Sequence, residues 1–177
     1  MELKSPKRYY IFKLILFVIL DVFIFLLRAQ ILEYLKIFIG TLMLLYSVEE
    51  IAFELVYDRK NFFHKEKPYL GFVELLIGIS VLITDIPFST VCVVWATWAI
   101  LREAYEIKDI IVELKNHLPR IISGVESFIA IGLSIQLIIA PSEIGAMIHI
   151  YLLLAELICA PLVPLLDIVL PDKKKAK

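Results

Sequence analysis

Cysteine and glycine are scarce in this sequence, and familiar catalytic motifs are missing. Its 177 residues include two cysteines and six glycines. Cys92 and Cys159 lie in separate apolar blocks, outside any Cys-x-x-Cys or Cys/His spacing, so neither zinc nor a disulfide between them is indicated. Gly-x-Ser-x-Gly, a Gly-rich phosphate loop and His-Glu-x-x-His are all absent. The sequence therefore predicts a protein that is not an enzyme and uses neither cofactor nor metal.

Apolar residues, in contrast, are abundant and occur in long blocks. They make up 60% of the chain, against roughly 45–50% in an ordinary soluble domain. The mean hydropathy is +0.86. A helix needs about 20 residues to cross a hydrocarbon layer of roughly 30 Å, and the blocks have that length. They also lack the alternation of barrel strands, so we expect an all-α, polytopic membrane protein.

Six such blocks divide the chain. A polar stretch at about 58–67 and a mixed, interfacial one at about 108–119 separate three hairpins, whose outer turns we expect at 28–30, 85–87 and 141–143. Ser142 is placed to cap the last block, which we expect to end near Pro161 or Pro164. The prediction is one integral membrane domain spanning 1–177, with hairpins at about 9–58, 68–108 and 119–168.

The basic residues predict how the chain lies in the membrane. Fifteen of the 18 Lys and Arg residues precede residue 14, follow residue 172, or lie in 58–67 and 108–120. The positive-inside rule then places both termini and the two longer loops on the cytoplasmic side of the cell membrane. The basic ends are typical of lipid-surface anchors and not of nucleic-acid sites. Lipid is thus the expected partner, together with a second copy of the chain or another membrane protein.

An alternative interpretation of the first block is a cleaved signal peptide over residues 1–29. A basic start, an apolar run and Ala29 fit that pattern loosely. Asp21 within the run and Arg28 beside the cleavage position argue against it.

An internal repeat links the second and third hairpins. Gly78-Ile79-Ser80 followed by Pro87 recurs 54 residues later as Gly132-Leu133-Ser134 followed by Pro141. Small residues of this kind allow neighbouring helices to approach closely in membranes. The two hairpins are therefore expected to be copies of one unit.

Three glutamates extend this repeat to the first hairpin. Glu50, Glu103 and Glu156 follow one another at intervals of 53 residues in the even-numbered blocks. Because each unit crosses the membrane twice, all three units have one orientation, as in parallel-repeat transporters. We expect three pseudo-equivalent parallel hairpins around a pseudo-threefold axis.

This arrangement resembles the HdeD family of acid-resistance membrane proteins. The resemblance begins with the architecture of six crossings in three hairpins. Two odd-numbered blocks each have a Gly–Pro pair, Gly78 with Pro87 and Gly132 with Pro141. Two even-numbered blocks also have similar endings, Glu156-Leu157-Ile158 and Arg102-Glu103-Ala104-Tyr105. The first hairpin has no Gly–Pro pair. The resemblance implies a cytoplasmic-membrane protein linked to stress or acid tolerance, and it supplies no catalytic or binding residues.

The repeated glutamates form a candidate proton or cation site. A carboxylate inside the apolar layer costs roughly 2.5–3.5 kcal/mol, so it must be protonated, face the bundle interior or find a cation. Around a threefold axis Glu50, Glu103 and Glu156 would converge, and His149 lies on the same helix face as Glu156, seven residues earlier. This interpretation predicts a small proton- or cation-conducting transporter or channel.

A structural interpretation of the same residues is also open. Arg102 occupies the repeat position of Glu49, so the two could form an ion pair between the second and fourth helices. His149 could equally bond a neighbouring helix. Glu49-Glu50 also resembles the paired glutamates of prenyl-endopeptidase-type intramembrane proteases. Glu54 stands where their motif has arginine, and the helical histidines of a metal site are missing apart from His149, which argues against that enzyme.

Overall fold

A computed structural model describes residues 6–57, 62–64, 66–112 and 118–169 of the protein. These residues form α-helices joined by turns, one 3-10 helix and no strand, which confirms the predicted all-α class. The elements are α1 (Pro6–Glu33), α2 (Leu35–Tyr57), η1 (Phe62–His64), α3 (Glu66–Ile83), α4 (Phe88–Val112), α5 (Leu118–Ile139) and α6 (Glu143–Val169).

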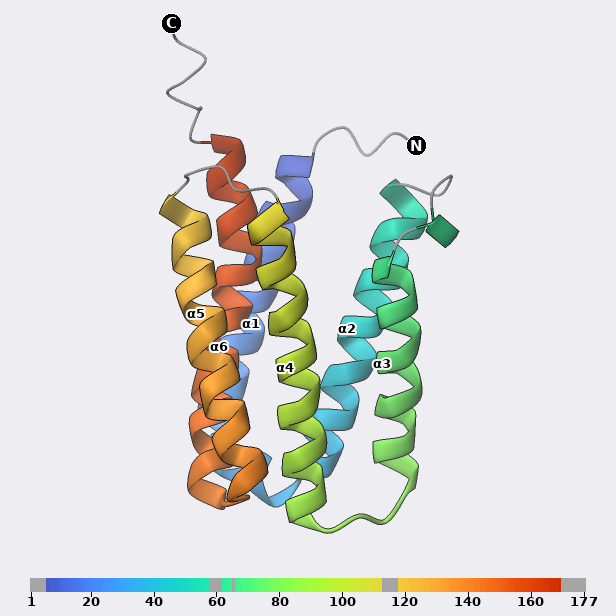
Figure 1. Ribbon diagram of the computed structural model, residues 1–177, viewed down its shortest axis with the longest axis vertical. Coiled ribbons are helices and arrows are strands. Elements are labelled where there is room, and N and C mark those ends of the chain that lie inside the picture. The colour runs from blue at the N-terminus through green and yellow to red at the C-terminus, as the bar shows by residue number, and fades with distance from the viewer. Residues whose placement is uncertain (1–5, 58–61, 65, 113–117, 170–177) are drawn as a thin grey trace, which may run out of the picture.

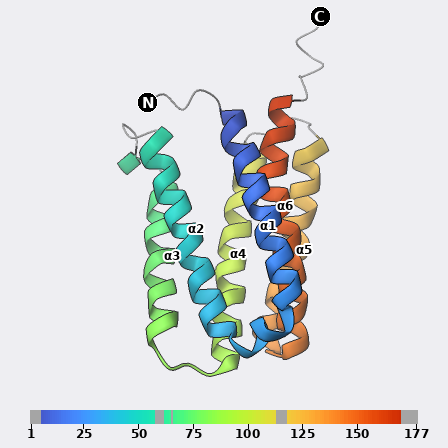
Figure 2. The same cartoon turned by 180° about the vertical axis from the view of Figure 1, so that it is seen from behind.

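The six helices run up and down along one axis (Figure 1). The start of α1 and the end of α6 lie at the same end of the bundle. The α1–α2, α3–α4 and α5–α6 connections all lie at the opposite end, as the view from behind also shows (Figure 2). Successive helices therefore alternate in direction.

Helix packing joins elements that belong to different predicted hairpins. The most extensive contacts are between α2 and α3, followed by α1 with α6 and α4 with α5. Helices α5 and α6 also pack together, whereas α2 meets α4 only locally and barely meets α1. The α2–α3 pair consequently stands somewhat apart from the other four helices (Figures 1 and 2).

Apolar side chains lie on both the inside and the outside of this bundle. Ile39, Met43 and Ile150 are fully buried. Large apolar side chains are nevertheless well exposed on the helices, among them Phe12 (66%), Leu76 (65%), Phe128 (68%) and Ile144 (76%). Large exposed apolar side chains on all six α-helices are unusual for a soluble protein.

Among the described residues, two helical stretches are both long and apolar enough to cross a membrane. They are Tyr10–Glu33 and Glu143–Val163, and only 11% and 35% of their most apolar windows are buried in the bundle. Pro68–Ile83 and Gly124–Ile139 are shorter apolar helices. These buried shares are small beside that of a core helix of a soluble protein, which is mostly buried.

The first turn lies later than the sequence predicted. Residues 28–30 belong to α1, and the break falls at Tyr34, which is the one residue between α1 and α2. The Tyr34 amide donates to Gln30 O at 3.1 Å, and the Phe38 amide donates to Tyr34 O at 3.0 Å. Residues 28–36 contain no glycine or proline, so nothing ends the helix at the polar residues 28–30, where the turn was predicted.

Two helix ends also extend past their predicted positions. Helix α4 continues to Val112, into the segment from about 108 that was predicted to be an interfacial connection, and Lys108 at its start is a good helix former. Helix α6 continues through Pro161 and Pro164 to Val169. Each proline removes one helix hydrogen bond, which here does not end the helix.

The two tight outer turns agree with the sequence. Ser142 caps α6, since its Oγ accepts a hydrogen bond from the Gly145 amide at 3.1 Å and its carbonyl accepts one from the Ala146 amide at 2.9 Å. At the start of α4, the Pro87 carbonyl accepts from the Val91 amide at 3.1 Å.

Close packing of α2 on α3 depends on glycine. A methyl group on Gly78 would lie 3.1 Å from Gly40 O and 3.1 Å from Met43 Cβ, so the two backbones approach each other closely. Gly132, at the equivalent repeat position of α5, has no atom within 4 Å of such a methyl group. The expectation of close helix approach is confirmed for Gly78 and wrong for Gly132.

Candidate functional site

A mostly buried arginine on α4 binds carboxylates from three other helices. Arg102 Nη1 donates to Glu50 Oε1 of α2 and to Glu74 Oε1 of α3, each at 3.3 Å. Its Nε lies 3.8 Å from Glu156 Oε1 of α6. The Arg102 side chain is 14% exposed and that of Glu74 only 1%. One guanidinium therefore connects four helices of the bundle.

Aromatic side chains complete this group, which we call the Arg102 cluster (Arg102, Glu50, Glu74, Glu156, Tyr46 and Trp98). The guanidinium carbon lies 4.0 Å from the centre of the Tyr46 ring and 5.4 Å from that of Trp98, both within cation–π range. Trp98 Nε1 also donates to Glu74 Oε1 at 2.9 Å. Planar stacking combined with several hydrogen bonds is a role that arginine fills and lysine does not.

The Arg102 cluster contains more acids than bases. It has one guanidinium and three carboxyl groups, so it would carry a net charge of −2 if every group were ionised. Glu49 has its own base, because Lys13 Nζ of α1 lies 3.0 Å from Glu49 Oε1. Unbalanced buried charge is costly in a low-dielectric environment, which favours protonation of part of these carboxyl groups.

Glu103 follows Arg102 in sequence but has a different environment. It is 3% exposed and lies beside Ser127 of α5. Within the described chain, its Oε2 is buried and has no hydrogen-bond partner. A fully buried carboxyl oxygen without a donor points to a protonated carboxyl group or a small bound partner.

Three further acids on odd-numbered helices have buried oxygens of this kind. The described residues supply no hydrogen bond to Glu74 Oε2, Glu126 Oε1 or either carboxyl oxygen of Asp21. Asp21 lies near the middle of α1 and is 8% exposed. The charged groups that act on Glu126 are Glu103, Glu156 and Glu106, all of them acids. Acidic groups thus extend beyond the Arg102 cluster.

His149 of α6 is held by two hydrogen bonds. Its Nδ1 lies 3.1 Å from Gly145 O, and its Nε2 lies 3.1 Å from Ser134 Oγ of α5. A carbonyl oxygen can only accept, so Nδ1 carries the hydrogen, and in the neutral ring Nε2 accepts from the Ser134 hydroxyl. Trp95 packs edge-on against the imidazole at 5.4 Å.

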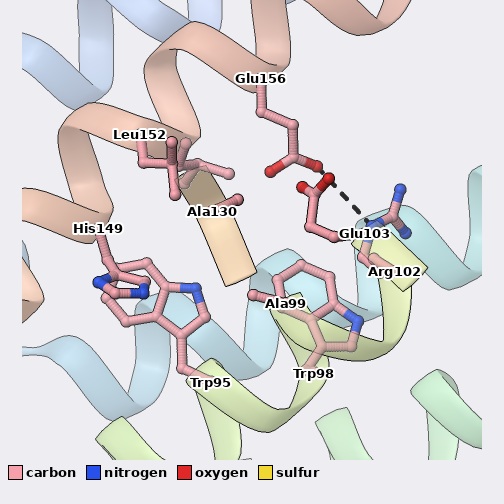
Figure 3. A pocket seen from close by; sticks show the side chains of 10 residues that line it. Trp95, Trp98, Ala99, Arg102, Glu103, Ala130, His149, Leu152 and Glu156 are labelled. Carbon is pink, nitrogen blue, oxygen red and sulfur yellow. Dashed lines mark ion pairs between the residues drawn. The ribbon is translucent and has the colours of Figure 1, made fainter. Parts of the chain in front are cut away.

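A small pocket lies between His149 and the carboxyl groups (Figure 3). It is lined by Trp95, Trp98, Ala99, Arg102, Glu103, Ala130, His149, Leu152, Leu153 and Glu156, and it has room for about one water molecule. Glu103 and Glu156 point toward each other at one side of it, whereas His149 lies beside Trp95 at the other (Figure 3). The pocket connects acids of α4 and α6 with the histidine.

The predicted triad is only partly brought together. Glu50 and Glu156 converge on Arg102, whereas Glu103 faces α5 and the pocket. His149 lines the same pocket as Glu156 and also bonds a neighbouring helix, which was the alternative prediction.

The predicted ion pair between Glu49 and Arg102 is wrong by one position. Glu50 bonds Arg102, and Glu49 bonds Lys13. Successive residues of a helix point about 100° apart, so the two glutamates of α2 face different neighbours, α4 and α1.

Sequence reasoning missed Glu74 and the two rings that stack on Arg102. Glu74 belongs to an odd-numbered block, outside the repeat of glutamates in the even-numbered blocks, and a buried position cannot be read from spacing alone. Trp98 lies in the middle of its block, away from the interfacial belt in which tryptophan is most common. A buried indole N–H group needs a hydrogen-bond acceptor, so the position of Trp98 could have been used to predict an acid nearby.

Metal-binding geometry is not found in the described ranges. They contain no group of three or more His, Cys, Asp and Glu side chains that could hold a metal ion. Cys92 and Cys159 are both free thiols. The chemistry of the site is therefore that of carboxyl groups, one guanidinium and one imidazole.

Comparison with known proteins gives no relative. No family model, curated protein or solved structure matches this chain.

Proposed function

We propose that the chain is an integral membrane protein that crosses the bilayer six times, with both termini in the cytoplasm of the cell. The two long apolar helices support two of the crossings. Support for the others comes from large apolar side chains at the surface of α2, α3 and α5, such as Leu45 (55%), Leu76 (65%) and Phe128 (68%). An outer surface of this kind is stable in lipid and aggregates in water.

The chain is a single membrane domain built from three hairpin repeats. The pairing of α2 with α3, α4 with α5 and α6 with α1 supports the repeat, since each even helix packs on the next odd one in cyclic order. The copies have diverged, because Ser134 is buried against His149 whereas Ser80 is exposed and bonds Leu76 O of its own helix.

The function that we propose is a non-enzymatic, HdeD-like role in stress or acid tolerance. The observation that carries it is the excess of carboxyl groups over the single guanidinium of Arg102 inside the bundle, where the side chain of Glu74 is 1% exposed and those of Glu50 and Glu156 are 17% exposed. Groups that are costly to ionise inside a membrane respond to proton concentration and are rarely kept without a function. A protein of this type binds protons when the environment becomes acidic.

An acid challenge tests this role. Cells expressing the wild-type chain should survive it better than cells without the chain, and Arg102→Gln at equal abundance should reduce the benefit. A control with Arg28→Gln, whose guanidinium donates to Phe25 O of its own helix at 2.7 Å, should retain it. Equal survival with and without the chain would rule out the acid-tolerance role.

A second candidate function is conduction of protons or another cation. The specific observation in its favour is the water-sized pocket between His149, Glu103 and Glu156. Such a pocket can hold a water that relays a proton between groups that do not touch.

Flux into liposomes tests conduction. The wild type should acidify dye-loaded vesicles under a pH gradient, and the triple variant Glu50→Gln, Glu103→Gln, Glu156→Gln should not. Asp85→Asn with Glu143→Gln changes only exposed acids and is the matched control. Absence of flux in the wild type would exclude conduction of the ions used and leave the first function in place.

A further inference from the structure

We propose that one ordered water molecule bridges Arg102 and Glu103 of α4 and Glu156 of α6, and so connects Glu103 to the Arg102 cluster. All three residues line the small pocket, and the atoms that bind the water are Arg102 Nε, Glu103 Oε2 and Glu156 Oε1. The site itself is independent of the proposed function. Only a proton relay across it rests on the second candidate function.

Two buried polar atoms at this pocket need a hydrogen-bond partner. Arg102 Nε is a donor, and Glu103 Oε2 is an acceptor when the carboxyl group is ionised. The described part of the chain supplies a hydrogen bond to neither atom. Glu103 is 3% exposed, so bulk solvent does not reach it. Buried groups of this kind are nearly always hydrogen-bonded, either to protein or to an ordered water.

The third partner is Glu156, whose Oε1 lies 3.8 Å from Arg102 Nε. This distance is within ion-pair range but exceeds that of a direct N–H···O hydrogen bond, which is about 2.7–3.2 Å. Polar atoms separated in this way are often joined through a water. The side chains of Glu103 and Glu156 point toward each other close to Arg102 (Figure 3). The three polar groups therefore surround one small volume.

The chemistry of these atoms selects water among small ligands. Arg102 Nε requires an acceptor, whereas ionised Glu103 and Glu156 require donors. A metal cation cannot accept from an N–H group, and a halide cannot donate to a carboxylate. A halide is also larger than water, and the pocket has room for about one water. Water accepts from the guanidinium and donates to both carboxylates, which gives it the three hydrogen bonds typical of a buried water.

His149 lines the same pocket but does not bind this water. Its Nδ1 bonds Gly145 O and its Nε2 bonds Ser134 Oγ, so both nitrogens of the neutral ring are in use. A proton relay through the water therefore connects Glu103 with Glu156 and bypasses the histidine. In this relay a protonated Glu103 gives its hydrogen to the water while the water gives another to the Glu156 carboxylate. The water is regenerated, and one proton has moved from α4 to α6.

A crystal structure of the whole protein grown in a lipid mesophase tests the site. The wild type should show one density peak within about 2.5–3.2 Å of Arg102 Nε, Glu103 Oε2 and Glu156 Oε1. Ala99→Val adds methyl groups to the pocket wall and should displace the water while leaving its three partners in place. Ala104→Val is the matched control, because Ala104 is an exposed residue of the same helix that does not line the pocket. It should retain the water.

Three results would overturn the site. They are a wild-type map without density between these atoms, a direct hydrogen bond from Arg102 Nε to Glu156, and an anomalous bromide signal at the peak after exchange of chloride for bromide. The last result would identify a halide. All three are read from the wild type, so they decide the question even if Ala99→Val does not fold.

Flux into liposomes separates the site from the relay. If the chain conducts through this water, Ala99→Val should abolish flux and Ala104→Val should preserve it. Density for the water together with no flux in the wild type would retain the site and reject the relay. Flux in a wild type without that density would retain conduction and reject the site.

Discussion

Arg102 and Glu74 are 28 residues apart in sequence, yet they form an ion pair of 3.3 Å in the interior of the bundle. Glu74 accepts from Trp98 Nε1 through the same oxygen. Two residues of α4, one helical turn apart, thus bind one carboxylate of α3. This contact connects α3 to α4, two helices that otherwise pack on other partners.

Removal of the guanidinium should destabilise the fold strongly. Arg102→Gln leaves Glu50, Glu74 and Glu156 without their cation, and breaking a buried ion pair typically costs about 3–5 kcal/mol. The free energy of unfolding, measured by SDS titration in lipid–detergent micelles, should fall by an amount of that order. Arg28→Gln should change it by less than about 0.5 kcal/mol. Equal, small effects of both substitutions would mean that the cluster is not a stabilising centre.

The two repeat-related glycines should differ in their tolerance of larger side chains. Gly78→Leu would drive a side chain into the backbone of Gly40, and overpacking of this kind costs about 1–3 kcal/mol. Gly132→Leu enters open space and should be nearly neutral. The same unfolding titration compares the two variants. A greater loss of stability for Gly132→Leu would contradict the described packing of α2 on α3.

The bond between His149 and Ser134 should be measurable as a coupling energy. Interhelical hydrogen bonds in membranes contribute about 0.6 kcal/mol on average and up to roughly 1.7. A double-mutant cycle of His149→Phe and Ser134→Ala should give a coupling in that range, because each residue bonds the other at 3.1 Å. Ser80→Ala is the control, as Ser80 bonds its own helix, and its coupling to His149→Phe should be zero.

The proposed topology predicts which positions a membrane-impermeant thiol reagent can reach. In a Cys92→Ser, Cys159→Ser background, Asp85→Cys should react in intact cells because it lies in an outer turn. Phe63→Cys, at a position that is 74% exposed in η1, should react only after permeabilisation. The reverse pattern would invert the orientation, and reaction at both positions in intact cells would reject the assignment of opposite sides.

Local chemistry explains which parts of the fold could be predicted from the sequence. Ser142 and Pro87 act within one turn of their own helix, so the helix starts that they mark were predicted correctly. The break at Tyr34 was not predicted, because neither glycine nor proline marks it. Pro161 was wrongly expected near a helix end, since the effect of one lost hydrogen bond depends on the packing around it.

The sequence was enough to predict which helices contribute acids to the candidate site, but not the directions in which their side chains point. Spacing identified Glu50 and Glu156, which do converge. Whether Glu49 or Glu50 meets Arg102 depends on the rotation of α2, which its close contact with α3 sets. That rotation is a tertiary property, and a repeat interval in the sequence contains no information about it.

The packing of α1 on α6 has a consequence for biosynthesis. The ribosome completes α1 long before it begins α6, and at roughly 5–20 residues per second the delay is on the order of ten seconds. In the proposed topology, α1, with Asp21 near its middle, is in the membrane throughout this interval without its main partner. Closure of the bundle therefore waits until α6 has been made. In the proposed topology, a chain truncated before α6 would expose an acidic residue to lipid, where membrane quality-control proteases can recognise it.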